Sequence, residues 1–235
     1  MKKNKMMRAA SALMVATLLT TSVISGTFAK YVTSESSNDT ARVAKFGVEI
    51  TANGTMFAKE YAKDNQNVLA TVTNSVISSD SDKVLAPGTS GDLAKSTITG
   101  TPEVAVDVKR EATLTLTGWM SKQSDVDTVE SYYCPIKITV GNTLYYGLDY
   151  DNANDFIAAV VGAINADSHD YAPKTNLSDI SNDTLSVTWE WAFEGLDGTK
   201  VNRTDYADTY LGNKAAEGNA PKIELTVTTT VTQID

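Results

Sequence analysis

The sequence predicts a mainly β protein: an antiparallel β-sandwich of the jelly-roll type with one short helix in a connection. Three observations support this fold class. Apolar and polar residues alternate in several separate segments, threonine fills many of the polar positions, and only one segment has a helical period. Because alternate side chains of a strand share a face, each segment is expected to bury one face and leave the other in water.

The alternating segments are spread over the whole chain. The first covers residues 43–51, the second residues 104–116, and the third residues 185–193. The last and clearest covers residues 223–232, where threonine dominates the polar side. β-branched residues favour a half-buried strand, so each of these segments is predicted to be a strand.

Two further strands are expected to form a hairpin. Residues 136–140 alternate, and residues 144–150 alternate again. Between them lie Gly141 and Asn142, which are residues typical of a tight two-residue turn.

The single helical segment covers residues 154–165. Asn152 or Asn154 can cap its N terminus, and Asp155 suits the positive end of its dipole. Its apolar face is formed by Phe156, Val160, Ala163 and Ile164. Residues 195–221 are expected to form a loop.

The N terminus has the three parts of a secretory signal peptide. Four basic residues lie within residues 1–8, and an uncharged run follows as far as Ala29. Thr27 and Ala29 are small residues at the −3 and −1 positions of a cleavage site, which would make Lys30 the first mature residue. The alternative is an uncleaved membrane anchor, but the run contains many serine and threonine residues.

The remainder is predicted to comprise a mobile segment, residues 30–44, and one β-sandwich domain, residues 45–235. The formal net charge of the chain is −9. Cleavage of the signal peptide would remove basic residues and no acidic ones, so the mature protein would be more acidic still. An acidic domain is repelled by nucleic acid and by anionic lipid, so neither is an expected partner, and no membrane attachment is expected after cleavage. The expected location is outside the cell or at its surface.

No catalytic motif is found, and an enzyme is not expected. His169 is the only histidine and Cys134 the only cysteine, and the chain has no His-Glu-x-x-His motif and no nucleotide-binding glycine loop. Cys134 is interpreted as a small buried hydrophobe, with a nucleophile or an intermolecular disulfide as alternatives. No cofactor is expected. Two acidic stretches leave calcium binding open, although solvated carboxylates are favoured: Asp149, Asp151 and Asp155, and Asp205 and Asp208.

The tryptophans permit two interpretations. Trp189 and Trp191 are two residues apart on a predicted strand and therefore share a face. Leu185, Val187 and Phe193 lie on the same face, which favours a place in the core. Alternatively, the two rings could form, together with Trp119, a platform on which sugar rings stack. The second interpretation makes the protein a carbohydrate-binding or cell-wall-binding module.

The region around the cleavage site resembles the TasA/camelysin family, which comprises secreted proteins of Gram-positive bacteria processed by the signal peptidase SipW. The resemblance is carried by Gly26-Thr27-Phe28-Ala29, by the aromatic Tyr31, and by a polar stretch that leads to the strand at Phe46 to Ile50. Ala86-Pro87-Gly88, Trp189-Glu190-Trp191 and residues 208–212 look like segments of related clostridial proteins.

The resemblance implies a jelly-roll subunit of extracellular fibres in a biofilm matrix. In the fibre-forming members, the segment released by cleavage adds as a strand to the next subunit, which is β-augmentation. Here residues 30–44 would be that strand, and Tyr31, Val32 and Val43 would be its apolar anchors. The implied partners are other copies of the chain, SipW, and components of the matrix or cell wall.

Overall fold

The computed structural model describes residues 42–53, 57–62, 74–79, 82–180, 184–192 and 204–234. The chain divides after Ala44 into two units, and the fold described below belongs to the second, Lys45–Asp235. The predicted signal peptide, its cleavage residues Thr27, Ala29 and Lys30, and the predicted anchors Tyr31 and Val32 lie outside the described residues. No helix in the described ranges is both long enough and apolar enough to cross a membrane.

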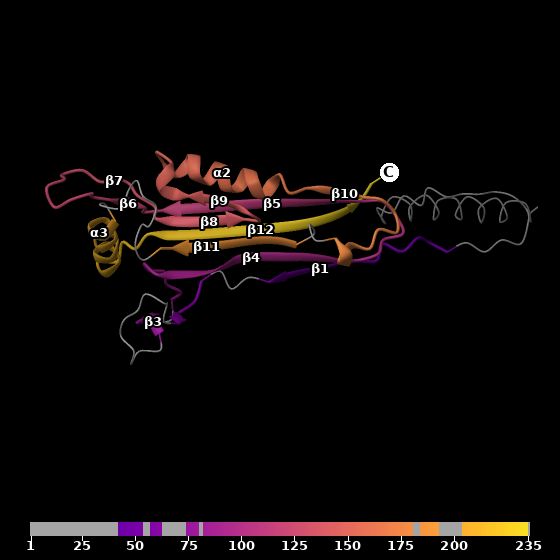
Figure 1. Ribbon diagram of the computed structural model, residues 1–235, viewed down its shortest axis with the longest axis horizontal. Coiled ribbons are helices and arrows are strands. Elements are labelled where there is room, and N and C mark those ends of the chain that lie inside the picture. The colour runs from indigo at the N-terminus through magenta and orange to yellow at the C-terminus, as the bar shows by residue number, and fades with distance from the viewer. Residues whose placement is uncertain are drawn as a thin grey trace, which may run out of the picture. The chain divides into compact units, whose positions relative to one another are not determined.

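The second unit is mainly β with antiparallel sheets, as predicted. Five strands form the larger sheet, in the order β1-β4-β11-β8-β9 (Figure 1). Their bounds are Val48–Asn53 for β1, Thr89–Gly100 for β4, Ile136–Val140 for β8, Thr143–Tyr146 for β9 and Thr184–Trp191 for β11. The predicted hairpin is confirmed: Val140 pairs with Thr143, and Gly141 has the positive φ of 59° that a tight turn requires.

Three strands form a second antiparallel sheet, in the order β10-β5-β12. β5 (Val106–Thr117) and β12 (Lys222–Gln233) pair along their full length, whereas β10 (His169–Tyr171) pairs only with the start of β5. Two small two-stranded sheets join β2 (Glu60–Ala62) to β3 (Asn74–Ile77), and β6 (Met120–Ser121) to β7 (Ser131–Tyr132).

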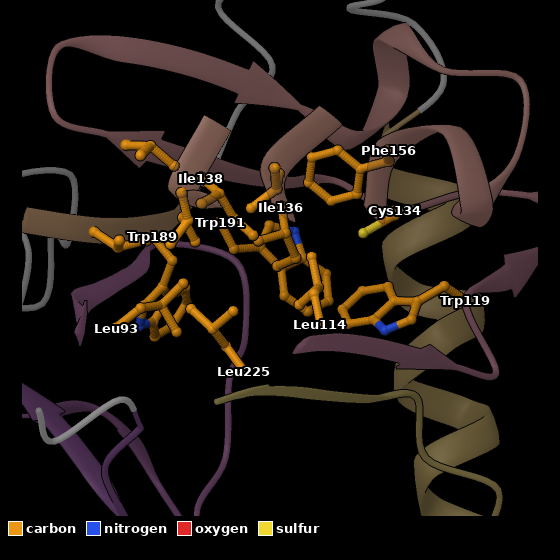
Figure 2. Close-up of a cluster of buried hydrophobic side chains, with 14 of the residues drawn as sticks. Leu93, Leu114, Trp119, Cys134, Ile136, Ile138, Phe156, Trp189, Trp191 and Leu225 are labelled. Carbon is orange, nitrogen blue, oxygen red and sulfur yellow. The ribbon is translucent and has the colours of Figure 1, made fainter. Parts of the chain in front are cut away.

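The two larger sheets contribute to one hydrophobic core. Figure 2 shows part of it, with side chains from several strands pointing toward one another. Its fully buried members include Leu93 from β4, Leu114 from β5, Ile138 from β8, Val187 from β11, Leu225 from β12 and Phe156 from a helix. Burial of apolar surface contributes about 25 cal/mol per Å², so this shared cluster is the main stabilising feature of the unit.

The predicted helix is confirmed as α2, Ala153–Asn165. The side chain of Asn152 caps it by accepting a hydrogen bond from the backbone N–H of Asp155 at 3.0 Å. Phe156, Val160 and Ile164 are fully buried, as their spacing predicts. At its other end, the side-chain oxygen of Asn165 accepts a hydrogen bond from the backbone N–H of Ala112 on β5 at 2.8 Å. β10 pairs with only the first three residues of this edge of β5. The helix therefore covers part of the edge that has no described partner strand.

The prediction of a single helix is wrong, because α3 (Thr204–Ala216) lies in the segment predicted to be a loop. Only Ala207 and Leu211 of this helix are fully buried, so the segment lacks the broad apolar face that identifies a helix in a sequence. The helix depends instead on tertiary contacts such as the hydrogen bond from the Ser121 hydroxyl to the carbonyl oxygen of Ala207, at 3.0 Å.

The sequence also gave no sign of β4, which lies between β1 and β11. Val187 of β11 pairs with Ala94, and Thr188 pairs with Asp92, so Leu93 is an extra residue in β4. Such a β-bulge reverses the alternation of inward and outward side chains. The inward residues are accordingly Leu93 at the bulge and Ser96 and Ile98 after it.

Two predicted strand boundaries are also wrong. β1 begins at Val48 rather than at residue 43, because Gly47 has a φ of 54°, which an extended strand does not contain. β9 ends at Tyr146 rather than at residue 150, because Gly147–Asp149 form a short 3₁₀ helix, η1.

One glycine is required by close packing, which gives a test of the fold. A Cβ at Gly147 would meet the carbonyl oxygen of Cys134 and would lie 3.1 Å from its Sγ, whereas a Cβ at Gly162 in α2 would have no neighbour within 4 Å. We expect Gly147→Ala to lower the free energy of unfolding by about 2–3 kcal/mol through overpacking. Gly162→Ala is the matched control and should raise it by about 0.5–1 kcal/mol. Urea denaturation measures both, and equal stability of the two variants would contradict this packing.

Candidate functional site

The last strand of the domain has one unoccupied edge. β12 contains 12 residues, and among the described strands it pairs only with β5. Such an edge presents a row of backbone N–H and C=O groups to any further strand. β12 is therefore the longest open edge that the described part of the chain offers.

The devices that normally prevent edge pairing are missing from most of β12. Proteins usually protect edges with charges, prolines or bulges. After Glu224 the strand carries no charged residue and no proline, and its register with β5 is uninterrupted. An edge without a bulge and without charge after Glu224 favours addition of another strand.

The inner side of β1 is exposed next to this edge. Ile50 lies directly opposite Ile98 in the register, so both side chains face the same side of the sheet. Ile98 is 0% exposed, whereas Ile50 is 40% exposed. The second sheet reaches β4 here, where the hydroxyl of Ser96 lies 2.9 Å from that of Thr229 on β12. Nearby, Val48 of β1 and Val231 of β12 both pack against a small buried cluster of Ile98, Val108 and Leu177, whereas Ile50 does not belong to it. A further strand beside β12 would cover Ile50.

The domain begins at the same end at which β12 finishes. The backbone N–H of Lys45 donates to the side chain of Glu103 at 2.8 Å, and the N–H of Glu103 donates back to the carbonyl oxygen of Lys45 at 2.9 Å. Ile234, just after β12, donates to the carbonyl oxygen of Ala105 at 3.0 Å. These contacts fix where the chain enters the domain. Val43, a predicted anchor, is 79% exposed.

All three tryptophans lie in the core. Trp119 and Trp189 are 2% exposed and Trp191 is 5% exposed (Figure 2). The rings of Trp119 and Trp191 meet edge to face with centroids 5.8 Å apart, and Phe57 and Tyr61 pack against Trp189. In addition, the Trp119 indole N–H donates to the carbonyl oxygen of Lys222 at 2.9 Å. Buried rings offer no face to a sugar, so this placement argues against the glycan platform.

Cys134 lies in the same core and is 0% exposed. Burial away from water disfavours the thiolate and raises the pKa of the Cys134 thiol to about 12. A nucleophilic cysteine needs an accessible thiolate, and an intermolecular disulfide needs an accessible sulfur. This environment therefore matches the interpretation as a small buried hydrophobe.

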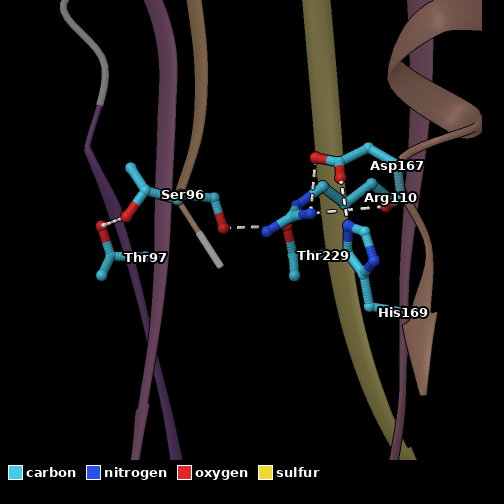
Figure 3. A network of polar contacts seen from close by, with 7 residues as sticks. Ser96, Thr97, Arg110, Asp167, His169 and Thr229 are labelled. Carbon is cyan, nitrogen blue, oxygen red and sulfur yellow. Dashed lines mark hydrogen bonds and ion pairs between the residues drawn. The ribbon is translucent and has the colours of Figure 1, made fainter. Parts of the chain in front are cut away.

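His169 belongs to a polar network around a buried arginine (Figure 3). Arg110 takes an inward position on β5 and its side chain is 0% exposed. Its Nη1 lies 2.6 Å from Oδ2 of Asp167, and Oδ1 of Asp167 lies 2.7 Å from Nε2 of His169. The carboxylate therefore joins the buried cation to the half-exposed imidazole. Cys134 lies in the main core and not in this network, so the histidine has no nucleophile among the contacts described.

The predicted acidic stretches do not form a cation site in the part of the chain that is described. No group of three or more histidine, cysteine, aspartate or glutamate side chains there is arranged to hold a metal ion. Asp155 accepts a hydrogen bond from the side-chain amide of Asn152 at 2.8 Å, and Asp208 accepts one from the Tyr133 hydroxyl at 2.7 Å.

Comparison with known proteins adds no further identification. No family model, no curated protein and no solved structure matches this chain.

The buried ion pair predicts a large effect of removing one partner only. Asp167→Ala leaves the Arg110 guanidinium buried without its carboxylate, and we expect the free energy of unfolding to fall by about 3 kcal/mol. The double variant Arg110→Met with Asp167→Ala should recover much of this loss, because the buried charge is then absent. Urea denaturation of the variants measures this. Asp167→Ala with wild-type stability would show that the pair has no structural role.

Proposed function

We propose that this protein is a secreted structural subunit of an extracellular fibre. In this proposal, residues 30–44 of one copy add as a strand to the open edge of β12 in the next copy. The observation that carries it is the 12-residue strand β12, which is uncharged after Glu224 and has one described neighbour, beside the exposed Ile50 of β1. The resemblance of residues 26–50 to the TasA/camelysin family supports the same function, a biofilm matrix location, and cleavage after Ala29 by a SipW-type peptidase.

The two main sheets are, in this proposal, the layers of a jelly-roll sandwich whose smaller sheet is one strand short. Their shared core and antiparallel order support this fold. The strand from the next copy would take the fourth position, beside β12 and over β1. It would cover Ile50 while its backbone pairs with β12.

The energy of this contact would come largely from the backbone. Residues 33–42 provide almost no apolar side chain, so packing contributes chiefly at Tyr31, Val32 and Val43. A donor of about 12 residues can form on the order of ten main-chain hydrogen bonds, each worth about 0.5–1.5 kcal/mol net. The entropy lost on association offsets part of this gain.

The position of Lys45 determines the direction of the added strand. The donor leaves each copy at the end where β12 finishes. In a fibre whose copies all point the same way, it reaches the next copy where β12 starts. Its chain direction is then opposite to that of β12, so the added strand is antiparallel. Such a head-to-tail contact repeats without closing into a ring.

The alternative function, a carbohydrate-binding or cell-wall-binding module, has lost the side chains on which it depended. Trp119, Trp189 and Trp191 are all buried, and they are the residues that were expected to form the stacking surface. We therefore do not propose it.

The first test removes the donor. Protein spanning residues 30–235 should form filaments or large oligomers, and protein spanning residues 45–235 should stay monomeric. Negative-stain electron microscopy and size-exclusion chromatography distinguish these states. Stable monomers of both proteins under all conditions would contradict the proposal.

The second test changes the acceptor. Ile50→Lys places a charge where the added strand would lie, so filaments of residues 30–235 should be lost. Ile50 is already 40% exposed in the monomer, so the free energy of unfolding should change by only about 1 kcal/mol. The control is Ile77→Lys on β3, where the isoleucine is 68% exposed and is not part of the proposed contact. Filaments of normal length from the Ile50 variant would exclude this acceptor.

A further inference from the structure

The helix α3 is attached to the end of the core by a small set of contacts. Ala207 and Leu211 are its fully buried residues. The Tyr210 hydroxyl donates to Oε1 of Glu130 at 2.8 Å, and Lys214 forms an ion pair with Oε2 of the same carboxylate at 3.0 Å. The helix leads directly into β12, because only residues 217–221 separate the two elements.

One of the attachments is the carboxylate of Asp208, which forms no ion pair with a lysine or arginine in the part of the chain that is described. Asp208 faces the core between Ala207 and Leu211 and accepts a hydrogen bond from the Tyr133 hydroxyl at 2.7 Å. The Trp191 indole lies near this carboxylate, but its N–H forms no hydrogen bond. Asp205 on the same helix adds a repulsive negative charge. The nearby cations have other partners. Lys122 lies over the ring of Tyr210, and Lys214 lies over the same ring and forms the ion pair with Glu130.

We propose that α3 is a proton-sensitive latch, which a proton on Asp208 tightens and loss of that proton loosens. The geometry accounts for this, because a neutral carboxylic acid can keep the hydrogen bond with Tyr133 without placing a charge against the core. The inference is independent of the proposed function.

The direction of the effect follows from the ionisation of Asp208. Burial is the largest cause and raises the pKa of Asp208 to about 6 from its ordinary value of 3.8. The attached helix therefore binds the proton more tightly than the detached helix does. Attachment is strongest below the ordinary pKa, weakens as the pH rises toward 6, and is weakest above it. Glu130 does not interfere in this range, because its hydrogen bond with Lys214 holds its pKa below the usual value.

Backbone hydrogen exchange of α3, corrected for the intrinsic pH dependence, tests the latch. In the wild-type protein we expect the equilibrium constant for opening of α3 to rise about tenfold between pH 5 and pH 7.5. Asp208→Asn can still accept the Tyr133 hydrogen bond and cannot ionise, so its protection should be the same at both pH values. The control Asp205→Asn removes an exposed carboxylate from the same helix and should keep most of the pH dependence.

Two results would overturn the proposal. One is wild-type protection of α3 that does not change between pH 5 and pH 7.5. The other is an Asp208→Asn protein with the wild-type pH dependence, which would assign the effect to another group. If Asp208→Asn does not fold, the ¹³C chemical shift of the Asp208 carboxyl in the wild-type protein decides: a titration midpoint near 6 supports the latch, and a midpoint near the ordinary value excludes it.

Discussion

A five-stranded sheet and a three-stranded sheet share one hydrophobic core, and this inequality determines the rest of the molecule. One sheet must extend beyond the other, and each overhanging part needs cover. At the β5 edge the cover is α2, which buries three apolar side chains and satisfies the N–H of Ala112. At the β12 edge the described residues provide no α-helix, and only near the end of the strand does Val231 pack against the cluster that contains Leu177 of the short 3₁₀ helix η2, Leu177–Asp179. The two sides of the same core are therefore chemically different, and assembly is proposed for the side that lacks an α-helix.

The core accounts for the positions of the tryptophans and the cysteine. Its tryptophans and its cysteine are buried against one another and against the two sheets, so the residue types that most often bind sugars or attack substrates serve packing here. Two charged side chains inside have structural partners as well. Arg110 is held by Asp167, and Asp208 is held by Tyr133. On β12 after Glu224 the exposed side chains are threonines and one glutamine, which suits association through main-chain hydrogen bonds.

The sequence predicts those elements whose period is regular. The strands around β5, β8, β11 and β12, the turn at Gly141, and α2 with its Asn152 cap all follow local rules, because burial of one face imposes the pattern directly. β4 was missed because the extra residue Leu93 reverses the alternation halfway along the strand. α3 was missed because two buried side chains do not make a visible period. The open edge was missed for a different reason: whether a strand has one neighbour or two depends on the order of strands in the sheet, which no local pattern contains.

The central claim is that β12 accepts a strand from residues 30–44 of another copy. The most direct measurement adds a synthetic peptide of residues 30–44 to protein spanning residues 45–235 and follows backbone hydrogen exchange by mass spectrometry. The account predicts slower exchange in residues 224–233 and around Ile50, with little change in α2, and no effect of a peptide of the same composition in scrambled order. Unchanged exchange along β12 at saturating peptide, or protection confined to another surface, would contradict it.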